Sequence, residues 1–384
     1  MDTAFPYSQY VTGKNFIGRR GDCQLLANLL GQGEHVAIYE PPKAGKTSLI
    51  QQTLFSMRVT GKAFTVGQFS VLNIRTEEDF LLRFGATVIR MAASTPAEYA
   101  AIVREFLPGT HFVFDETAFS DRDEVVSLGW ALDGDDVKAM LSLPFRLAKE
   151  KAMRLLLVID EFQNITFFED GDRILRTLDA VIRECGDAGL RGFSFILCGS
   201  MVNAMKDIFE TSLLFHRRVE RVRLSRVDER EIADHVGKGF LSGGKVLDKE
   251  LLLGACRLFR NNFWYINHFA SICDSMARGF IMEPVLVDAL QSLIAVHEPR
   301  FRAVMNGLTT HQVNLLRATA EGVTRFSASE VIRKYSLNSS ANVKRVKDAL
   351  RKKEILVFDD QDVPSFIDPL FEYWIKKYYF ETKA

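Results

Sequence analysis

The chain has 384 residues, and its 49 Lys and Arg residues balance 49 Asp and Glu residues. This length suggests two or three domains, and a content of 47% hydrophobic and 26% charged residues is that of an ordinary globular protein. The composition excludes disordered and collagen-like chains, and no apolar run approaches the roughly 20 residues that a membrane-spanning helix needs.

Two further features bear on location and partners. The five cysteines are scattered without a CxxC pair, and the N-terminal residues lack a basic leader followed by an apolar core. We therefore expect reduced thiols, no signal peptide and a cytoplasmic protein. The neutral charge is uneven along the chain, since residues 1–220 carry a net charge of −5, residues 221–306 of +2 and residues 307–384 of +3.

The first 225 residues alternate apolar runs with helical patterns. Continuous apolar runs predict buried parallel strands at His35–Tyr39, Leu155–Ile159 and Phe193–Cys198, with a weaker one at Phe64–Leu72. Helical patterns lie between them, at Ser48–Ser56, Glu78–Ala92, Val137–Lys151 and Asp172–Glu184. This alternation predicts an α/β fold with a parallel sheet sandwiched by helices.

An acidic stretch interrupts this pattern at about residues 110–136. Residues 115–136 hold eight carboxylates against the single Arg122. We interpret the stretch as a solvated, partly helical insertion, and a surface that faces a partner is the alternative.

A phosphate-binding loop follows the first predicted strand. The loop is Glu40-Pro-Pro-Lys-Ala-Gly-Lys-Thr47, and a helix begins near Ser48. Backbone N–H groups at a helix N-terminus can bind phosphate. The Lys46 ammonium would reach the β- and γ-phosphates, and the Thr47 hydroxyl would bind Mg²⁺. The nucleotide contacts that we expect from this loop are Pro42, Lys43, Ala44, Gly45, Lys46, Thr47 and Ser48. Glu40 stands where the motif usually has glycine.

A pair of carboxylates follows the strand at Leu155–Ile159. Asp160 and Glu161 come directly after this buried strand, at the edge where open α/β sheets bind ligands. Asp160 is therefore a second candidate ligand of Mg²⁺, and Glu161 is the candidate base that deprotonates the attacking water.

Polar residues after the next strand complete the candidate site. Ser200 is a candidate sensor of the γ-phosphate, and capping the helix that follows is its alternative role. Arg217, or its neighbour Arg218, is a candidate arginine finger acting within the chain or on a neighbouring copy, and a surface salt bridge is the alternative.

The last 80 residues predict a winged helix-turn-helix. Helices are expected from Leu308, at Ser327–Tyr335 and at Ala341–Lys353, followed by a hairpin of Ile355–Asp359 and Val363–Ile367. The third helix is strongly basic, and its candidate contacts with duplex DNA are Lys344, Arg345, Lys347 and Arg351. Docking to protein, autoinhibition and a purely structural role are the alternatives.

With these motifs in order, the chain resembles the P-loop ATPases of the AAA+/STAND group, and most of all the archaeal-type ATPases related to origin-recognition and Cdc6-like proteins. The residues that carry the resemblance are Asn15-Phe-Ile-Gly-Arg-Arg20, the phosphate loop, Ile159-Asp-Glu-Phe-Gln163, Cys198-Gly-Ser200 and Leu214-Phe-His-Arg217. It implies that Ile17, Gly18 and Arg19 flank the adenine of ATP. It also implies a helical lid, in which Arg260–Asn267 replaces the usual Gly-Asn-Pro-like turn.

Together these observations predict three domains and a function. Residues 1–225 would form the nucleotide domain, 226–304 the helical lid and 305–384 the winged helix. We expect a Mg²⁺-dependent nucleotide switch that binds ATP, hydrolyses it slowly and couples its state to the winged helix. The alternatives are a signalling ATPase that oligomerises or docks a protein partner, and a non-hydrolysing ATP binder.

Overall fold

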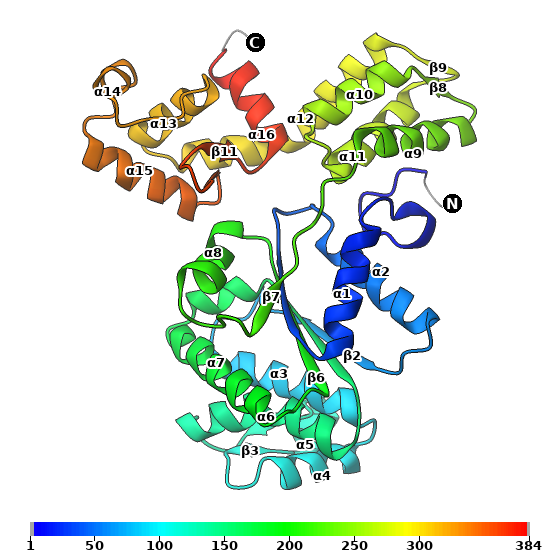
Figure 1. Cartoon of the computed structure of the whole chain (residues 1–384), viewed down its shortest axis with the longest axis vertical. Helices are drawn as coiled ribbons and strands as arrows, with labels where there is room; N and C mark the ends of the chain where they lie inside the picture. The colour runs from blue at the N-terminus through cyan, green and yellow to red at the C-terminus, as the bar shows by residue number, and fades with distance from the viewer. Residues whose placement is uncertain (1–3, 382–384) are drawn as a thin grey trace. The chain divides into compact units, whose positions relative to one another are not determined.

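The computed structural model of the protein describes residues 4–381. Contacts between residues divide it into two compact units, which are described separately below (Figure 1). The sheet unit comprises residues 21–40 and 52–224, and the helical unit comprises the described parts of residues 1–20, 41–51 and 225–384. The boundary falls on either side of the phosphate loop, so helix α2 (Lys46–Val59) begins in the helical unit and ends in the sheet unit.

The sheet unit is built on a five-stranded parallel sheet in the order β2-β5-β6-β1-β7. The strands are β1 (His35–Tyr39), β2 (Thr65–Ser70), β5 (Leu155–Asp160), β6 (Phe193–Gly199) and β7 (Val219–Arg221). The central strands β1 and β6 are buried along their whole length, as continuous apolar runs predict for a sheet covered on both faces. All four predicted strands are thus confirmed, and β7 adds a fifth.

Helices flank this sheet and cover it with apolar side chains. They are α1 (Arg20–Gln32), α3 (Glu77–Ala92), α4 (Pro96–Phe106), α5 (Glu116–Arg122), α6 (Gly134–Glu150), α7 (Gly171–Asp187) and α8 (Val202–Lys206), with the short helical turns η2 (Phe162–Phe167) and η3 (Asp207–Thr211). Aromatic rings join the layers, since Phe84 of α3 and Phe145 of α6 both pack on Phe195 of β6. Figure 1 shows α3, α6 and α7 gathered beside the sheet.

The acidic stretch is partly helical, as predicted, and its status as an insertion stays a prediction. It contains α5 and the small antiparallel pair of β3 (Phe112–Val113) and β4 (Ser127–Leu128). Most of its carboxylates cap a helix or pair with a nearby arginine, so they have a local structural role. Asp115 caps α5, Asp133 and Asp136 cap α6, Asp123 pairs with Arg90, and Glu124 pairs with Arg122.

The helical unit contains the predicted lid and winged-helix segments. Its helices are α9 (Glu229–Ser242), α10 (Lys249–Leu258), α11 (Phe263–Met276), α12 (Glu283–Asn306), α13 (Thr310–Ala320), α14 (Ser329–Lys334), α15 (Ser340–Lys352) and α16 (Pro369–Trp374), with the turns η1 (Gly13–Asn15) and η4 (Ile375–Tyr379). Its short strands are β8 (Val246–Leu247) paired with β9 (Phe280–Ile281), and β10 (Leu356–Phe358) paired with β11 (Pro364–Phe366).

The last part of this unit is a winged helix with the expected three helices and antiparallel hairpin. Thr309 caps α13 through a capping box with Gln312, and α15 buries Val343, Val346 and Leu350. One apolar cluster runs from α9 through α12 into the winged helix, so the lid and winged-helix segments share a core. The predicted boundary between them stays a prediction.

The cysteines and the lengths of the helices can be compared with the predictions from sequence. All five cysteines are free thiols. Within residues 4–381, every helix is too short or too polar to cross a lipid bilayer.

Candidate functional site

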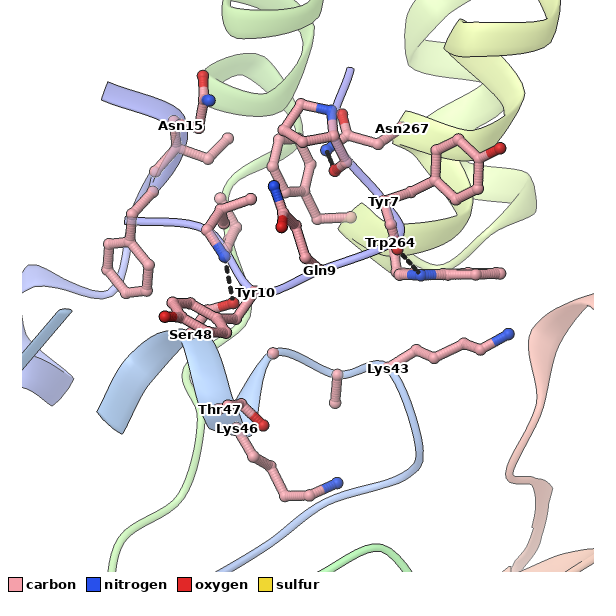
Figure 2. A pocket seen from close by; sticks show the side chains of 18 of the residues that line it. Tyr7, Gln9, Tyr10, Asn15, Lys43, Lys46, Thr47, Ser48, Trp264 and Asn267 are labelled. Atoms are coloured by element: carbon pink, nitrogen blue, oxygen red, sulfur yellow. Dashed lines mark hydrogen bonds between the residues drawn. The ribbon is translucent and has the colours of Figure 1, made fainter. Parts of the chain in front are cut away.

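The helical unit contains a cavity of about 300 Å³ beside the phosphate loop (Figure 2). Four parts of the chain line it: the N-terminal segment, the loop itself, Val227 just before α9, and the start of α11. The polar and aromatic lining residues labelled in Figure 2 are Tyr7, Gln9, Tyr10, Asn15, Lys43, Lys46, Thr47, Ser48, Trp264 and Asn267. A cavity with a cationic loop on one side and aromatic rings on another suits a ligand that has both an anionic and a flat apolar part.

The phosphate loop has the backbone that an anion site requires. Gly45 has a φ of +98°, a conformation that favours glycine, and the Leu49 N–H donates to the Gly45 carbonyl at 3.0 Å as α2 begins. The Lys46 side chain is buried and its Nζ donates to the Pro41 carbonyl at 3.1 Å, so it folds back along the loop. The exposed Thr47 lies in the first turn of α2, and the N–H groups of a first turn have no partner within their own helix.

Arg19 lies against this loop. Its Nη1 donates to the Ala44 carbonyl at 2.7 Å and its Nε to the Ser225 carbonyl at 2.9 Å. The φ of Gly45 favours glycine, and a Cβ there would also lie 2.8 Å from Arg19 Nη1 and would displace the end of that side chain. The guanidinium therefore ties the N-terminal segment to the phosphate loop.

Lys43 contacts the opposite wall of the cavity. Its ammonium lies 3.4 Å from the centroid of the Trp264 ring, which is a cation–π contact. Partial burial lowers the pKa of Lys43 to about 8, and the charge of Arg300 acts in the same direction. The Trp264 ring is held in turn, because its Nε1–H donates to the Tyr7 carbonyl at 2.5 Å.

Of the three residues that the resemblance places beside adenine, Ile17 and Arg19 line the cavity. Gly18 serves the fold instead: its N–H donates to Glu231 at 2.9 Å, and a Cβ there would lie 2.9 Å from Val227. Pro42 is exposed and lies outside the lining.

Several lining residues escaped the sequence reasoning. The N-terminal Tyr7, Gln9 and Tyr10 precede every recognised motif, so no pattern marks them. Trp264 and Asn267 belong to the altered lid turn, and the Asn267 Nδ2 donates to the Pro6 carbonyl at 2.9 Å. The only sequence feature that could have indicated Trp264 and Asn267 as lining residues is that they are an aromatic and a polar residue at the start of a lid helix.

The sheet unit holds the second group of candidate residues. Asp160 ends β5, and its Oδ1 accepts from the Glu161 N–H at 3.0 Å. Glu161 has a left-handed backbone with a φ of 52°. Its Oε2 accepts from the Ser200 hydroxyl at 2.8 Å and from the Gln163 amide at 2.5 Å, so a carboxylate and two donors form a compact polar cluster.

Ser200 thus contacts the candidate base directly. Its alternative role as the cap of the next helix does not match the structure, because Met201, and not Ser200, occupies the cap position of α8. The role of Ser200 as a γ-phosphate sensor stays a prediction.

The candidate arginine finger lies on a loop with an uncommon backbone. Arg217 is exposed and has a φ of 57°. Arg218 is half-buried, and its Nη1 donates to the His216 carbonyl at 3.4 Å. The role of either arginine as a finger stays a prediction.

The two candidate Mg²⁺ ligands, Thr47 and Asp160, provide the oxygen donors that this cation prefers. They belong to different compact units. Their joint action on one ion stays a prediction.

The basic residues of helix α15 differ in exposure and in pairing, which the sequence does not show. Lys344 and Arg345 are exposed, whereas Lys347 pairs with Asp362 of the wing and lies 4.6 Å from the Phe358 ring centroid. Arg351 is half-buried and shares a surface hollow with Lys344 and Lys347. Of the four candidate contacts, Lys344 and Arg345 are therefore the ones most open to a polyanion.

Comparisons with known proteins agree with this architecture. A family model described as "Probable winged helix domain" matches residues 299–377. A Walker-type ATPase of Pyrococcus abyssi superposes on the chain with a TM-score of 0.68 and 14% identity, covering 97% of this chain and 100% of the other. The ORC2 protein of Aeropyrum pernix, solved in ADPNP–ADP complexes, gives a TM-score of 0.57 and 15% identity over 99% and 98%.

At these identities the likeness concerns the fold. The chain has the parallel sheet and flanking helices of P-loop ATPases, followed by a winged helix. No curated protein matches the sequence.

Proposed function

We propose that the chain binds ATP with Mg²⁺, hydrolyses it slowly and couples the nucleotide state to its winged helix. The cavity of the helical unit carries this proposal, because the phosphate loop from Lys43 to Ser48 faces an aromatic wall there. Its volume of about 300 Å³ lies within the range of small-molecule sites. The fold shared with Walker-type ATPases supports the same ligand.

Each part of the nucleotide has a proposed partner. The N–H groups at the start of α2 and the Lys46 ammonium hold the phosphates, and the aromatic side of the cavity, bordered by Ile17 and Arg19, holds the base. Thr47 and Asp160 provide oxygen ligands for Mg²⁺, which neutralises charge on the phosphate oxygens when it is bound.

Glu161 is the proposed general base. In hydrolysis the oxygen of water bonds to the γ-phosphorus, and the bond from that phosphorus to the bridging oxygen breaks. One proton of the water passes to the Glu161 carboxylate, and ADP and phosphate are released. Arg217 is proposed to stabilise charge on the transferred phosphoryl group, in the same chain or in a neighbouring copy.

Calorimetric titration with ATP and Mg²⁺ tests the binding step. We expect saturable binding by the wild type and a loss of affinity of about tenfold or more in Lys46→Ala, which corresponds to about 1.4 kcal/mol or more. Lys238→Ala is the matched control, because Lys238 is an exposed lysine of the same unit outside the cavity. Equal affinity in all three proteins, or no binding by the wild type, would contradict the proposal.

A second function, binding of duplex DNA, is favoured by one observation. Lys344 and Arg345 are exposed side by side on α15, the helix that precedes the wing. Two exposed cations on one helix suit the phosphates of a duplex.

A further inference from the structure

Glu161 begins a tight turn that the core holds in place. Its backbone is left-handed, with φ and ψ of 52° and 41°, and the next residues form the helical turn η2. Phe162 is fully buried and packs against Phe209, with ring centroids 5.8 Å apart. A left-handed backbone at a non-glycine residue costs about 1–2 kcal/mol, so the surrounding packing must maintain it.

This turn brings the Gln163 side chain back onto the Glu161 carboxylate. The Nε2 of Gln163 donates to Glu161 Oε2 at 2.5 Å, and Gln163 is only 1% exposed. Its amide oxygen Oε1 is buried and accepts no hydrogen bond from the described residues. A buried polar atom without a hydrogen bond lowers the stability of the folded protein. Gln163 therefore costs folding stability at this position while it binds the Glu161 carboxylate.

The Gln163 amide packs closely against the end of β6. A Cβ added to Gly199 would lie 2.5 Å from Gln163 Oε1 and 2.4 Å from the Met205 side chain, so the carboxamide fills the space that this glycine leaves. A larger residue at Gly199 would therefore displace the Gln163 amide or the Met205 side chain.

Both hydrogen bonds to the carboxylate end on the same oxygen. The Ser200 hydroxyl and the Gln163 amide both donate to Oε2, while Oε1 of Glu161 accepts from neither. Hydrogen bonds to an ionised carboxylate are stronger than neutral ones, and two of them restrict its rotation. Oε1 is thus the oxygen left to accept a proton from water.

We propose that Gln163 is a positioning residue for ATP hydrolysis: together with Ser200 it fixes the Glu161 carboxylate so that Oε1 takes the proton of the attacking water. The inference rests on the proposed function. It adds a residue that acts through Glu161 and does not touch the nucleotide.

Steady-state hydrolysis and ATP binding by Gln163→Met, which keeps the side-chain length, test this role. We expect kcat to fall about 10- to 100-fold, a part of what a general base contributes, with KM and ATP affinity within about twofold of the wild type. In the Glu161→Gln background the same substitution should change kcat no further, because its effect passes through Glu161. Thr166→Val is the matched control: it removes a 2.7 Å hydrogen bond to the Gln163 carbonyl in the same turn and leaves the carboxylate contacts in place.

Gln163→Glu is isosteric and gives a second readout. It replaces the amide donor by an acceptor beside the Glu161 carboxylate, so kcat should fall at least as far as in Gln163→Met, with ATP affinity within about twofold of the wild type.

The inference is overturned if both Gln163 variants keep the wild-type kcat, or if Gln163→Met lowers kcat as much in the Glu161→Gln background as in the wild type. Those outcomes leave the proposed function standing, because the wild type still binds and hydrolyses ATP. A wild type without turnover removes the hydrolytic function itself, and the inference with it.

Discussion

At the residue scale, several candidate site residues have a backbone conformation that is uncommon outside glycine. Arg19, Lys43 and Glu161 all have positive φ, at 54°, 65° and 52°. Such residues cost about 1–3 kcal/mol each and persist only where the surroundings hold them. Here the hydrogen bonds of Arg19 to Ala44 and of Glu161 to Gln163 supply part of that support.

His35 makes the sheet unit sensitive to acid. It is buried at the start of β1, and its Nδ1 accepts from the Phe195 N–H at 3.0 Å, so the ring is neutral. Burial, followed by the charges of Arg154 and Arg191, lowers the pKa of His35 to about 4 from 6.5. Because the folded pKa is the lower one, stability is full above about pH 6.5 and declines as the pH falls toward 4. The expected loss is about 2 kcal/mol between about pH 7.5 and pH 5.

Urea unfolding of the wild type and of His35→Asn at both pH values checks this. Asparagine keeps an acceptor near Nδ1 but cannot take up a proton, so the variant should lose about 2 kcal/mol less stability on acidification. An equal loss in both proteins would assign the acid sensitivity to other groups.

At the element scale, the sequence predicted the order and type of the main elements well. The strand at residues 35–39 matches β1, and the apolar runs before Asp160 and Gly199 match β5 and β6, because buried parallel strands need uninterrupted apolar residues. The phosphate loop and the carboxylate pair were recognisable because their chemistry lies in consecutive residues.

Contacts between distant segments were not recognisable. The hydrogen bond from Ser200 to Glu161, the placement of Lys43 on Trp264 and the pairing of Lys347 with Asp362 depend on how elements pack. No periodicity or local spacing encodes these contacts. The sequence therefore provides no reason to expect one basic residue of α15 to be a better DNA contact than another.

The structure of α15 leads to a ranking that salt-dependent DNA binding can test. Each phosphate contact contributes about −0.9 to the slope of log affinity against log salt. Replacing both Lys344 and Arg345 by alanine should therefore make the slope shallower by about 1.8. Lys347→Ala should have a smaller effect, because the Lys347 ammonium already pairs with Asp362. Equal effects of all three residues, or no salt-sensitive binding at all, would contradict DNA contact by this helix.

At the scale of the whole molecule, two compact units divide the proposed machinery. The helical unit carries the cavity and Lys46, and the sheet unit carries Glu161 with its two donors. Binding and hydrolysis should therefore be separable by substitution, since each depends on side chains of a different unit.

Phosphate release at saturating ATP, measured beside ATP binding for the wild type, Lys46→Ala and Glu161→Gln, tests this division most directly. We expect slow turnover by the wild type and loss of both binding and turnover in Lys46→Ala. In Glu161→Gln, binding should be retained while turnover falls by about 100-fold or more, the scale of general base catalysis. Turnover that survives Glu161→Gln, or a wild type that neither binds nor hydrolyses ATP, would contradict the account.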